Sequence, residues 1–559
     1  MTYHEFIVRI PAFIVLIVIS GPFSAWADVP ALMGKLSADD PTSRDRAGRE
    51  LLEAGPSARP ALVAALRSAD PELRLRAGRL LLRMPWTHPD DPPAVRDVLA
   101  QYGKPQPEER LQKVAVLASL PDQAGVPALL RLLGEDPSDS VRWAICGKLR
   151  LIQSSRVWNR LRQMEPVDRS GPELASMGWA WAHYDPRQSV QLMRQAIEED
   201  VGRPEQSSGE ITLVLRYAIE QERLGGQFGE AIQLLRRGII RSGGYQRSQW
   251  AFELLALQVQ QGPLEGFEQD RAVCQSILSP AMGLYVAGKL DQQQGDQTAA
   301  KQKYQQALET SQTPVEHLQA GDMLLDQRWD DLAERELNRV LEQHGGVEGN
   351  VMANAHFRLA QLAERRGDDF QTAEHLRQGL EAAGQTPGTV LTGPGAQGIW
   401  AQVYWRYYRA ATERGDNTAT EKNLSKLLAL DDDDGEIAMD LTPRLSALGR
   451  KDEAMRIFDS AYRPARVLLD ADQENPELLN NLAWLCARGG QNLTEALECA
   501  RRATALAPHH PAFLDTQAEA EYRNGNRETA ITLEKRALEL RPGDPFMQKQ
   551  LRRFEAGQP

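Results

Sequence analysis

The sequence predicts an all-α protein built as a solenoid of helical hairpins. Two segments near the C-terminus, ALECARRATALAP ending at Pro508 and AITLEKRALELRP ending at Pro542, are copies of each other 34 residues apart. A different repeat, of 30 residues, occupies the N-terminal part. Fixed periods of this size are typical of stacked helix pairs, and 559 residues are too many for one compact core.

Residues 1–27 have the pattern of a secretory signal. Arg9 precedes the apolar run 13–19, and Ala25-Trp26-Ala27 matches a small-residue cleavage site. We therefore expect cleavage after Ala27, a mature chain that begins at Asp28, and a periplasmic or secreted location. The alternative is that the segment stays uncleaved and anchors the chain in a membrane.

The net charge of −12 is unevenly distributed along the chain. Residues 28–165 have a slight excess of Lys and Arg, whereas residues 166–559 are strongly acidic. Nucleic-acid binding needs clustered positive charge to neutralise phosphates, so the composition disfavours nucleic acid as a partner. The two parts are expected to differ in fold and in surface.

Residues 28–165 contain Asp-Pro steps that open successive helices. Arg46-Ala47-Gly48-Arg49 after Asp40-Pro41 recurs as Arg76-Ala77-Gly78-Arg79 after Asp70-Pro71, and Asp136-Pro137 begins a third copy. Asp caps exposed N–H groups, and Pro suits the first helical position. These residues resemble HEAT repeats, which implies antiparallel helix pairs. We expect the Arg side chains of this block to be solvated or paired with Asp.

Between residues 166 and 475 the hairpin pattern is weaker. After a helical connector at 166–204, a Gly-containing turn followed by a small residue recurs through the stretches 205–385 and 399–475. Gly226 with Ala231, and Gly295 with Ala300, are two instances. The stretch 386–398, rich in Gly and Pro, is predicted to be a loop.

Residues 476–544 carry the best-preserved repeat pair. Pro476, Pro511 and Pro545 mark helix starts, and small residues recur at matched positions of the paired helices, at Ala483, Ala496, Ala503, Ala518, Ala530 and Ala537. This pair resembles the tetratricopeptide repeat (TPR), and the weaker copies upstream resemble degenerate TPRs. The resemblance implies a TPR-like superhelix after the HEAT-like array. Residues 545–559 are predicted to form a capping helix with a polar outer face.

The four cysteines are too few for a disulfide framework. Cys486 and Cys499 fall on the two helices of one predicted hairpin, so a disulfide between them is an alternative. The favoured interpretation is that all four, with Cys146 and Cys274, are small buried residues.

No motif of the sequence indicates catalysis, a cofactor or a metal site. The histidines lack metal-ligand spacing, and Asp431 to Asp434 lack the spacing of an EF-hand. The glycines of 392–398 lack the Lys-Ser/Thr of a P-loop. We therefore predict no catalytic residue, no cofactor and no metal.

Two surface features are candidates for partner binding. The densest aromatic cluster lies at 400–408, where Trp400, Tyr404 and Tyr407 are expected in the core, and Trp405 or Tyr408 is expected to reach a groove. Asn481 occupies a position at which some TPR proteins hold a C-terminal carboxylate. The matching face of the next repeat, with Ala512 and Thr516, offers no cation for that mode.

The sequence thus predicts an exported protein-binding scaffold or adaptor of the cell envelope, which is not an enzyme and binds a protein or peptide. One alternative is a membrane-tethered envelope-assembly factor. Another is an accessory subunit or an enzyme with an unrecognised site, for instance within residues 165–280.

Overall fold

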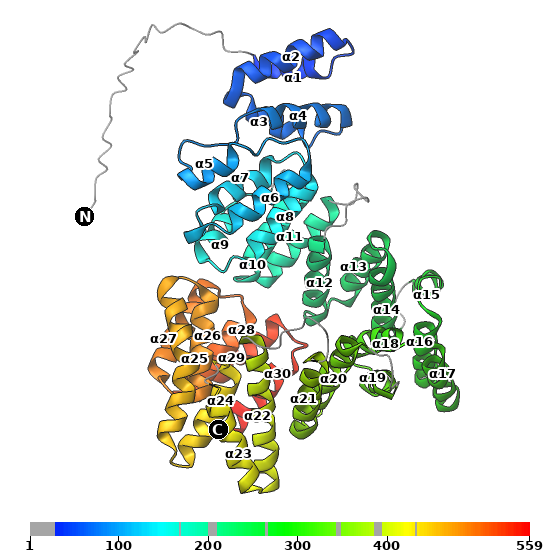
Figure 1. The fold of residues 1–559 in the computed structure, drawn as a ribbon, viewed down its shortest axis with the longest axis vertical. Coiled ribbons are helices and arrows are strands. Elements are labelled where there is room, and N and C mark those ends of the chain that lie inside the picture. Colours follow the sequence, from blue (N-terminus) through cyan, green and yellow to red (C-terminus); the bar gives the residue numbers. More distant parts are fainter. Residues whose placement is uncertain are drawn as a thin grey trace, which may run out of the picture. The chain divides into compact units, whose positions relative to one another are not determined.

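The computed structural model describes residues 28–166, 169–199, 209–262, 266–342, 348–384, 394–430 and 433–558. Within these residues it contains 30 α-helices and no strand (Figure 1). The predicted array of helical hairpins is confirmed. The predicted signal segment, most of the 386–398 loop, and Asp431 lie outside the described residues.

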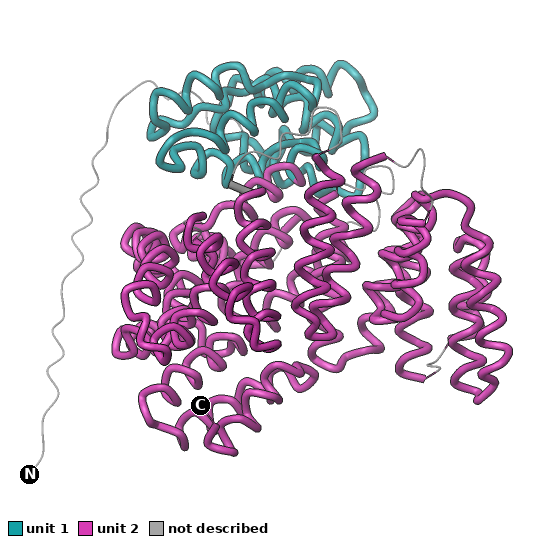
Figure 2. Tube along the Cα trace, turned by 60° about the horizontal axis from the view of Figure 1, so that its bottom comes forward, with its two compact units in different colours: residues 1–142 teal, residues 143–559 magenta. Residues whose placement is uncertain are grey.

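The chain divides into unit 1, residues 1–142, and unit 2, residues 143–559 (Figure 2). The change of repeat expected at residue 165 is a separate matter from this division and stays a prediction. The helices of unit 1 are α1 (Val29–Leu36), α2 (Pro41–Ala54), α3 (Arg59–Ala65), α4 (Pro71–Arg83), α5 (Pro93–Leu99), α6 (Pro107–Ala118) and α7 (Val126–Glu135). Helix α8 (Asp139–Arg150) crosses the division.

The repeat of unit 1 has a structural signature at its arginines. Arg44 donates to the carbonyl oxygens of Ala38 (2.9 Å) and Asp39 (2.6 Å), which precede the N-terminus of α2. Arg74 repeats this contact before α4, with the carbonyls of Ser68 (2.6 Å) and Ala69 (3.0 Å). These side chains fasten each helix start to the preceding turn, rather than forming only the expected Asp–Arg pairs.

A further copy of this contact was not identified from the sequence. Arg110 donates to the carbonyl oxygens of Lys104 (2.5 Å) and Pro105 (3.1 Å) before α6. Its helix begins with Pro107 after Gln106, so this copy lacks the Asp-Pro step that marks the others in the sequence. Arg110 is also buried and pairs with Asp136 at 2.9 Å.

Unit 2 is a succession of helices that pair with their neighbours in the chain. They are α9 (Ser155–Arg162), α10 (Gly171–Ala182), α11 (Pro186–Glu199), α12 (Gly209–Leu224), α13 (Phe228–Arg241), α14 (Gly244–Gln261), α15 (Phe267–Gln275), α16 (Pro280–Gln293), α17 (Gln297–Thr310), α18 (Pro314–Asp326), α19 (Asp330–Glu342), α20 (Gly349–Arg365), α21 (Asp369–Gly384), α22 (Pro394–Arg414), α23 (Asn417–Leu428), α24 (Gly435–Ala447), α25 (Lys451–Ala471), α26 (Pro476–Gly489), α27 (Leu493–Leu506), α28 (Pro511–Arg523), α29 (Arg527–Leu540) and α30 (Pro545–Ala556). Because α22 begins at Pro394, residues 394–398 of the predicted loop are helical.

Paired helices approach closely where a small residue faces a large one. A Cβ added to Gly288 of α16 would lie 2.4 Å from the Tyr304 ring of α17, and one added to Gly321 of α18 would lie 2.8 Å from Leu337 of α19. The two pairs have the same sequence separation, so one packing rule serves both hairpins. The expected Gly turn between paired helices is also present, since Gly295 has a φ of +89° between α16 and α17.

Helices early in unit 2 contact helices near its end. His183, just after α10, has its Nδ1 2.5 Å from a carboxylate oxygen of Glu477 in α26. Burial alone would raise the pKa of Glu477, but the hydrogen bond and charge of His183 outweigh burial and lower it. Such contacts are non-local, and repeat periodicity does not predict them.

All four cysteines are free and buried, as the favoured interpretation expected. Among the described residues, no helix has the length and apolar character that a membrane crossing requires.

Candidate functional site

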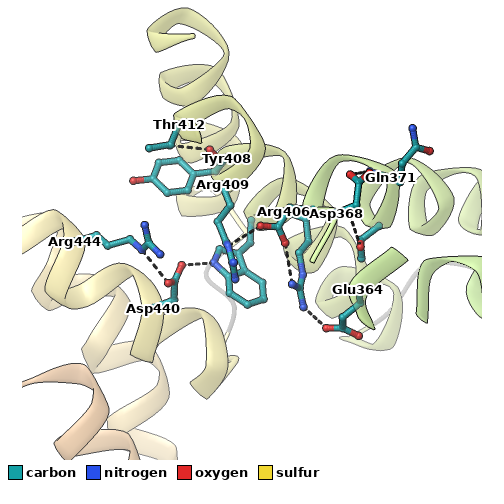
Figure 3. Close-up of polar contacts among 12 residues, drawn as sticks. Glu364, Asp368, Gln371, Arg406, Tyr408, Arg409, Thr412, Asp440 and Arg444 are labelled. Carbon is teal, nitrogen blue, oxygen red and sulfur yellow. Dashed lines mark hydrogen bonds and ion pairs between the residues drawn. The ribbon is translucent and has the colours of Figure 1, made fainter. Parts of the chain in front are cut away.

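Helix α22, which carries the aromatic cluster, packs on both α21 and α23. Its buried face contains Trp405, 2% exposed, and Tyr408, 3% exposed. The Trp405 indole donates a 2.8 Å hydrogen bond to Asp440 of α24. Asp440 also accepts from Arg444 at 2.9 Å, so the indole is held by an ion pair on the neighbouring helix (Figure 3).

Two arginines of α22 form ion pairs with the same carboxylate, that of Asp369. Arg406 and Arg409 lie 2.9 Å and 2.8 Å from the two oxygens of Asp369, the first residue of α21. Their guanidinium carbons lie 4.4 Å and 5.2 Å from the centre of the Trp405 ring. Arg406 additionally pairs with Glu364 (Figure 3). These ion pairs, together with the Trp405 hydrogen bond, connect α22 to α21 through Asp369 and to α24 through Asp440.

The expectation that Trp405 or Tyr408 reaches a groove does not fit this structure, in which both are buried. The expectation was wrong because helical spacing shows which residues share a face but not which face packs against the neighbouring helices. Buried charges are tolerated when they are paired, and Asp369 pairs with both arginines. The aromatic residues that remain accessible are the three expected in the core: Trp400, Tyr404 and Tyr407.

Trp400, Tyr404 and Tyr407 line a cavity of about 520 Å³. We call it the α22 pocket; its walls come from α21, α22 and α23. The three rings are spaced four and three residues apart, which places them on one helical face. Further along the same face, Arg414 lines the far end of the pocket.

The aromatic walls of the α22 pocket are ordered by ring contacts. Trp400 and Tyr404 stack with centroids 5.7 Å apart, and Phe370 of α21 meets Tyr407 edge-on at 5.8 Å. The Tyr407 hydroxyl donates to Glu374 at 2.6 Å. Burial, followed by this hydrogen bond, raises the pKa of Tyr407 to about 12, so the hydroxyl keeps its proton at neutral pH.

Basic side chains surround these rings. Arg414 lies 4.4 Å above the Phe370 ring, Lys426 of α23 lies 4.9 Å from the Tyr404 ring, and Lys422 lines the same wall. Arg377 also lines the pocket, but it is paired with Glu374 and Glu381. Hydrogen bonding from Arg377 is the largest effect on Glu374 and lowers the pKa of that carboxyl.

Asn481 is exposed on α26 and lies apart from the α22 pocket. Nearby on the same helix, Trp484 meets Phe546 of α30 edge-on, with centroids 6.0 Å apart. The structure therefore does not bring Asn481 together with Trp405 and Tyr408. The residues that sequence reasoning missed are Phe370, Arg414, Lys422 and Lys426. The separation of Lys422 and Lys426 by four residues was the available signal, since it places both on one face.

Among the described residues, no group of three or more His, Cys, Asp or Glu side chains is arranged to hold a metal ion. The chemistry that the α22 pocket offers is therefore that of rings and cations: apolar contact, ring stacking and attraction of negative charge.

No known protein family matches the chain, and no curated protein matches it. Solved structures with a similar arrangement include a thermophilic TPR protein of Thermus thermophilus, with 17% identity, 44% of this chain and 98% of that chain covered, and a TM-score of 0.24. Yeast Tom70 has 12% identity, with 81% and 92% covered and a TM-score of 0.31. A Rap protein complexed with competence and sporulation factor has 15% identity, with 65% and 100% covered and a TM-score of 0.26.

Proposed function

We propose that this chain is an exported scaffold that binds a protein or peptide partner in the cell envelope. The observation that carries the proposal is the α22 pocket, an accessible aromatic and basic cavity on an array of helical hairpins. Hairpin arrays present extended surfaces that suit binding. The proposal includes a HEAT-like character for the N-terminal repeats and no catalytic role for the chain.

Within residues 165–280, where the alternative of an unrecognised enzyme site was placed, three polar side chains from three helices contact one another. Asp270 of α15 accepts from Arg236 of α13 at 2.9 Å and from Gln258 of α14 at 2.5 Å. This arrangement cross-links three helices, and pairing of this kind favours a structural role over a catalytic one.

Export is proposed from the pattern of residues 1–27. N-terminal sequencing of the protein recovered from fractionated cells tests it, with a start at Asp28 in the periplasm or medium expected. An intact N-terminus in the membrane fraction would support the tethered alternative. An intact N-terminus in the cytoplasm would contradict both.

Partner binding is tested by photo-crosslinking in living cells. A benzoylphenylalanine replaces Trp400 in the pocket or, as a control, Lys301 on the exposed surface of α17. We expect a discrete crosslinked protein at position 400 that is absent at position 301. A set of further positions on α20 to α26 that captures no protein at all would contradict the scaffold function.

A further inference from the structure

We propose that the α22 pocket binds an extended acidic segment of a partner protein, with an apolar or aromatic side chain of that segment inserted among the pocket rings. This inference rests on the proposed scaffold function and specifies the chemistry of the partner.

The charge of the pocket is opposite to that of the chain. The whole chain carries −12, yet four basic residues line the pocket against one acidic residue, Asp416. Asp416 is occupied as the cap of α23, since its side chain accepts from the Ala419 amide at 2.9 Å. The local potential therefore favours a negatively charged occupant.

Three of the cations are available to such an occupant. Arg377 is committed to Glu374 and Glu381, whereas Arg414, Lys422 and Lys426 have no carboxylate partner among the residues that the structure describes. Arg414 and Lys426 lie against ring faces, which orients them along the pocket wall and leaves donors for a ligand. A solvated cation loses little on meeting a carboxylate, so these three groups select acidic side chains.

The rings explain why the occupant also carries an apolar side chain. Phe370, Trp400, Tyr404 and Tyr407 are all half-buried and face one cavity. The Tyr407 hydroxyl already donates to Glu374, so this residue offers its ring to the pocket rather than a free polar atom. Half-buried rings that line a cavity are suited to an aromatic or aliphatic anchor with a polar surround.

The shape of the pocket favours an extended segment. From Trp400 to Arg414 the wall follows α22 for about 21 Å, at about 1.5 Å per residue. An extended peptide rises about 3.3 Å per residue, so about six residues would follow this wall. A folded domain would need a broader surface, whereas a strand-like segment places alternate side chains toward the rings and toward the cations.

The test uses the full mature chain and a short fluorescein-labelled peptide in which Glu residues flank a central Phe. The control peptide has Lys in place of each Glu. Fluorescence anisotropy is expected to show saturable binding of the acidic peptide alone, which weakens as salt rises from about 50 to 500 mM. Equal binding of the two peptides, or no binding of the acidic one, would overturn the inference.

Two variants locate the binding on the chain. Lys422→Glu combined with Lys426→Glu is expected to weaken the acidic peptide at least about tenfold, and Trp400→Ala is expected to weaken it without removing its salt dependence. The matched control is Lys301→Glu combined with Lys451→Glu, which makes the same charge change at exposed positions on α17 and α25. Equal loss in the control would show a general effect of net charge and would overturn the assignment to the pocket.

The crosslinking and peptide-binding experiments test the scaffold function and the ligand class separately. If a crosslinked partner forms in cells but the acidic peptide fails to bind in vitro, the scaffold function stands and the ligand class inferred here is wrong. If crosslinking fails at every position tested while the acidic peptide binds as expected, the ligand class stands and the scaffold function is contradicted.

Discussion

Asp472 caps a helix that lies 317 positions away in the chain. Its two carboxylate oxygens accept hydrogen bonds from the backbone N–H of Ser155 (2.7 Å) and from the Ser155 hydroxyl (2.5 Å). Ser155 is the first residue of α9, and Asp472 follows the last residue of α25. A helix start leaves N–H groups without partners, and here a distant carboxylate supplies one. The contact ties the beginning of unit 2 to its final repeats.

Asp472→Ala is expected to destabilise unit 2 by about 1–2 kcal/mol, because it removes two hydrogen bonds at a helix N-terminus. Urea unfolding measures the loss, and hydrogen exchange of the Ser155 amide locates it. Asp470→Ala is the control, since it removes a neighbouring, exposed carboxylate that pairs with Arg466 within its own helix. Unchanged exchange at Ser155 would show that the contact does not persist in solution.

Gly288→Ala is expected to destabilise the hairpin of α16 and α17 by about 1–3 kcal/mol. The added Cβ would lie 2.4 Å from the Tyr304 ring, so the ring or the helix must move. Gly283→Ala on the same helix is the control, because its Cβ meets nothing within 4 Å. There the higher helix propensity of Ala is expected to stabilise the helix by up to about 1 kcal/mol. Thermal unfolding distinguishes the two, and equal effects would contradict the packing rule.

The positions of helices could be predicted from the sequence because the signals are local. Asp70 before Pro71 specifies a helix start, and its carboxylate does cap α4 through the Glu72 amide at 2.9 Å. The buried and accessible faces of α22 were predicted the wrong way round. The buried face is fixed by ion pairs with Asp369, which lies 37 residues before Arg406 in a different hairpin. The Ser155–Asp472 contact could not be predicted from the sequence either, because no local pattern indicates which distant helices contact each other.

Acidification is expected to destabilise the hairpin of α20 and α21 through His356. Its Nδ1 lies 3.2 Å from the Nδ1 of His375, and burial together with the charge of His375 lowers the pKa of His356 to about 4. Burial also lowers the pKa of His375. The unfolded chain therefore binds more protons than the folded one between about pH 6.5 and pH 4, and stability falls as pH decreases through that window.

The expected contribution of His356 is a loss of about 2 kcal/mol between pH 7 and pH 5, and His356→Gln is expected to flatten this part of the profile. Urea unfolding midpoints at several pH values measure the effect. His509→Gln replaces an exposed histidine after α27 and serves as the control. A profile of the His356 variant that parallels the unmodified chain would contradict the assignment.

Glu534 of α29 is buried at the position where the preceding repeat has Ala500. Its two carboxylate oxygens have no hydrogen-bond donor among the described residues. Burial, followed by the negative charge of Asp515 on α28, raises the pKa of Glu534 well above its ordinary value. Asp515 itself accepts from Gln550 of the final helix at 2.8 Å. The folded state thus keeps a proton on Glu534 that the unfolded chain releases above about pH 4.5.

Because the folded state binds this extra proton, stability falls as pH rises above about 4.5. Glu534→Gln supplies a neutral side chain of the same shape that needs no proton and donates to Asp515. We expect it to stabilise the α28–α30 region by about 1–2 kcal/mol at pH 8 and by less at pH 5. Glu528→Gln, an exposed change on the same helix, is the control in the same thermal-unfolding series. A gain that does not grow with pH would show that Glu534 is already ionised in the folded protein.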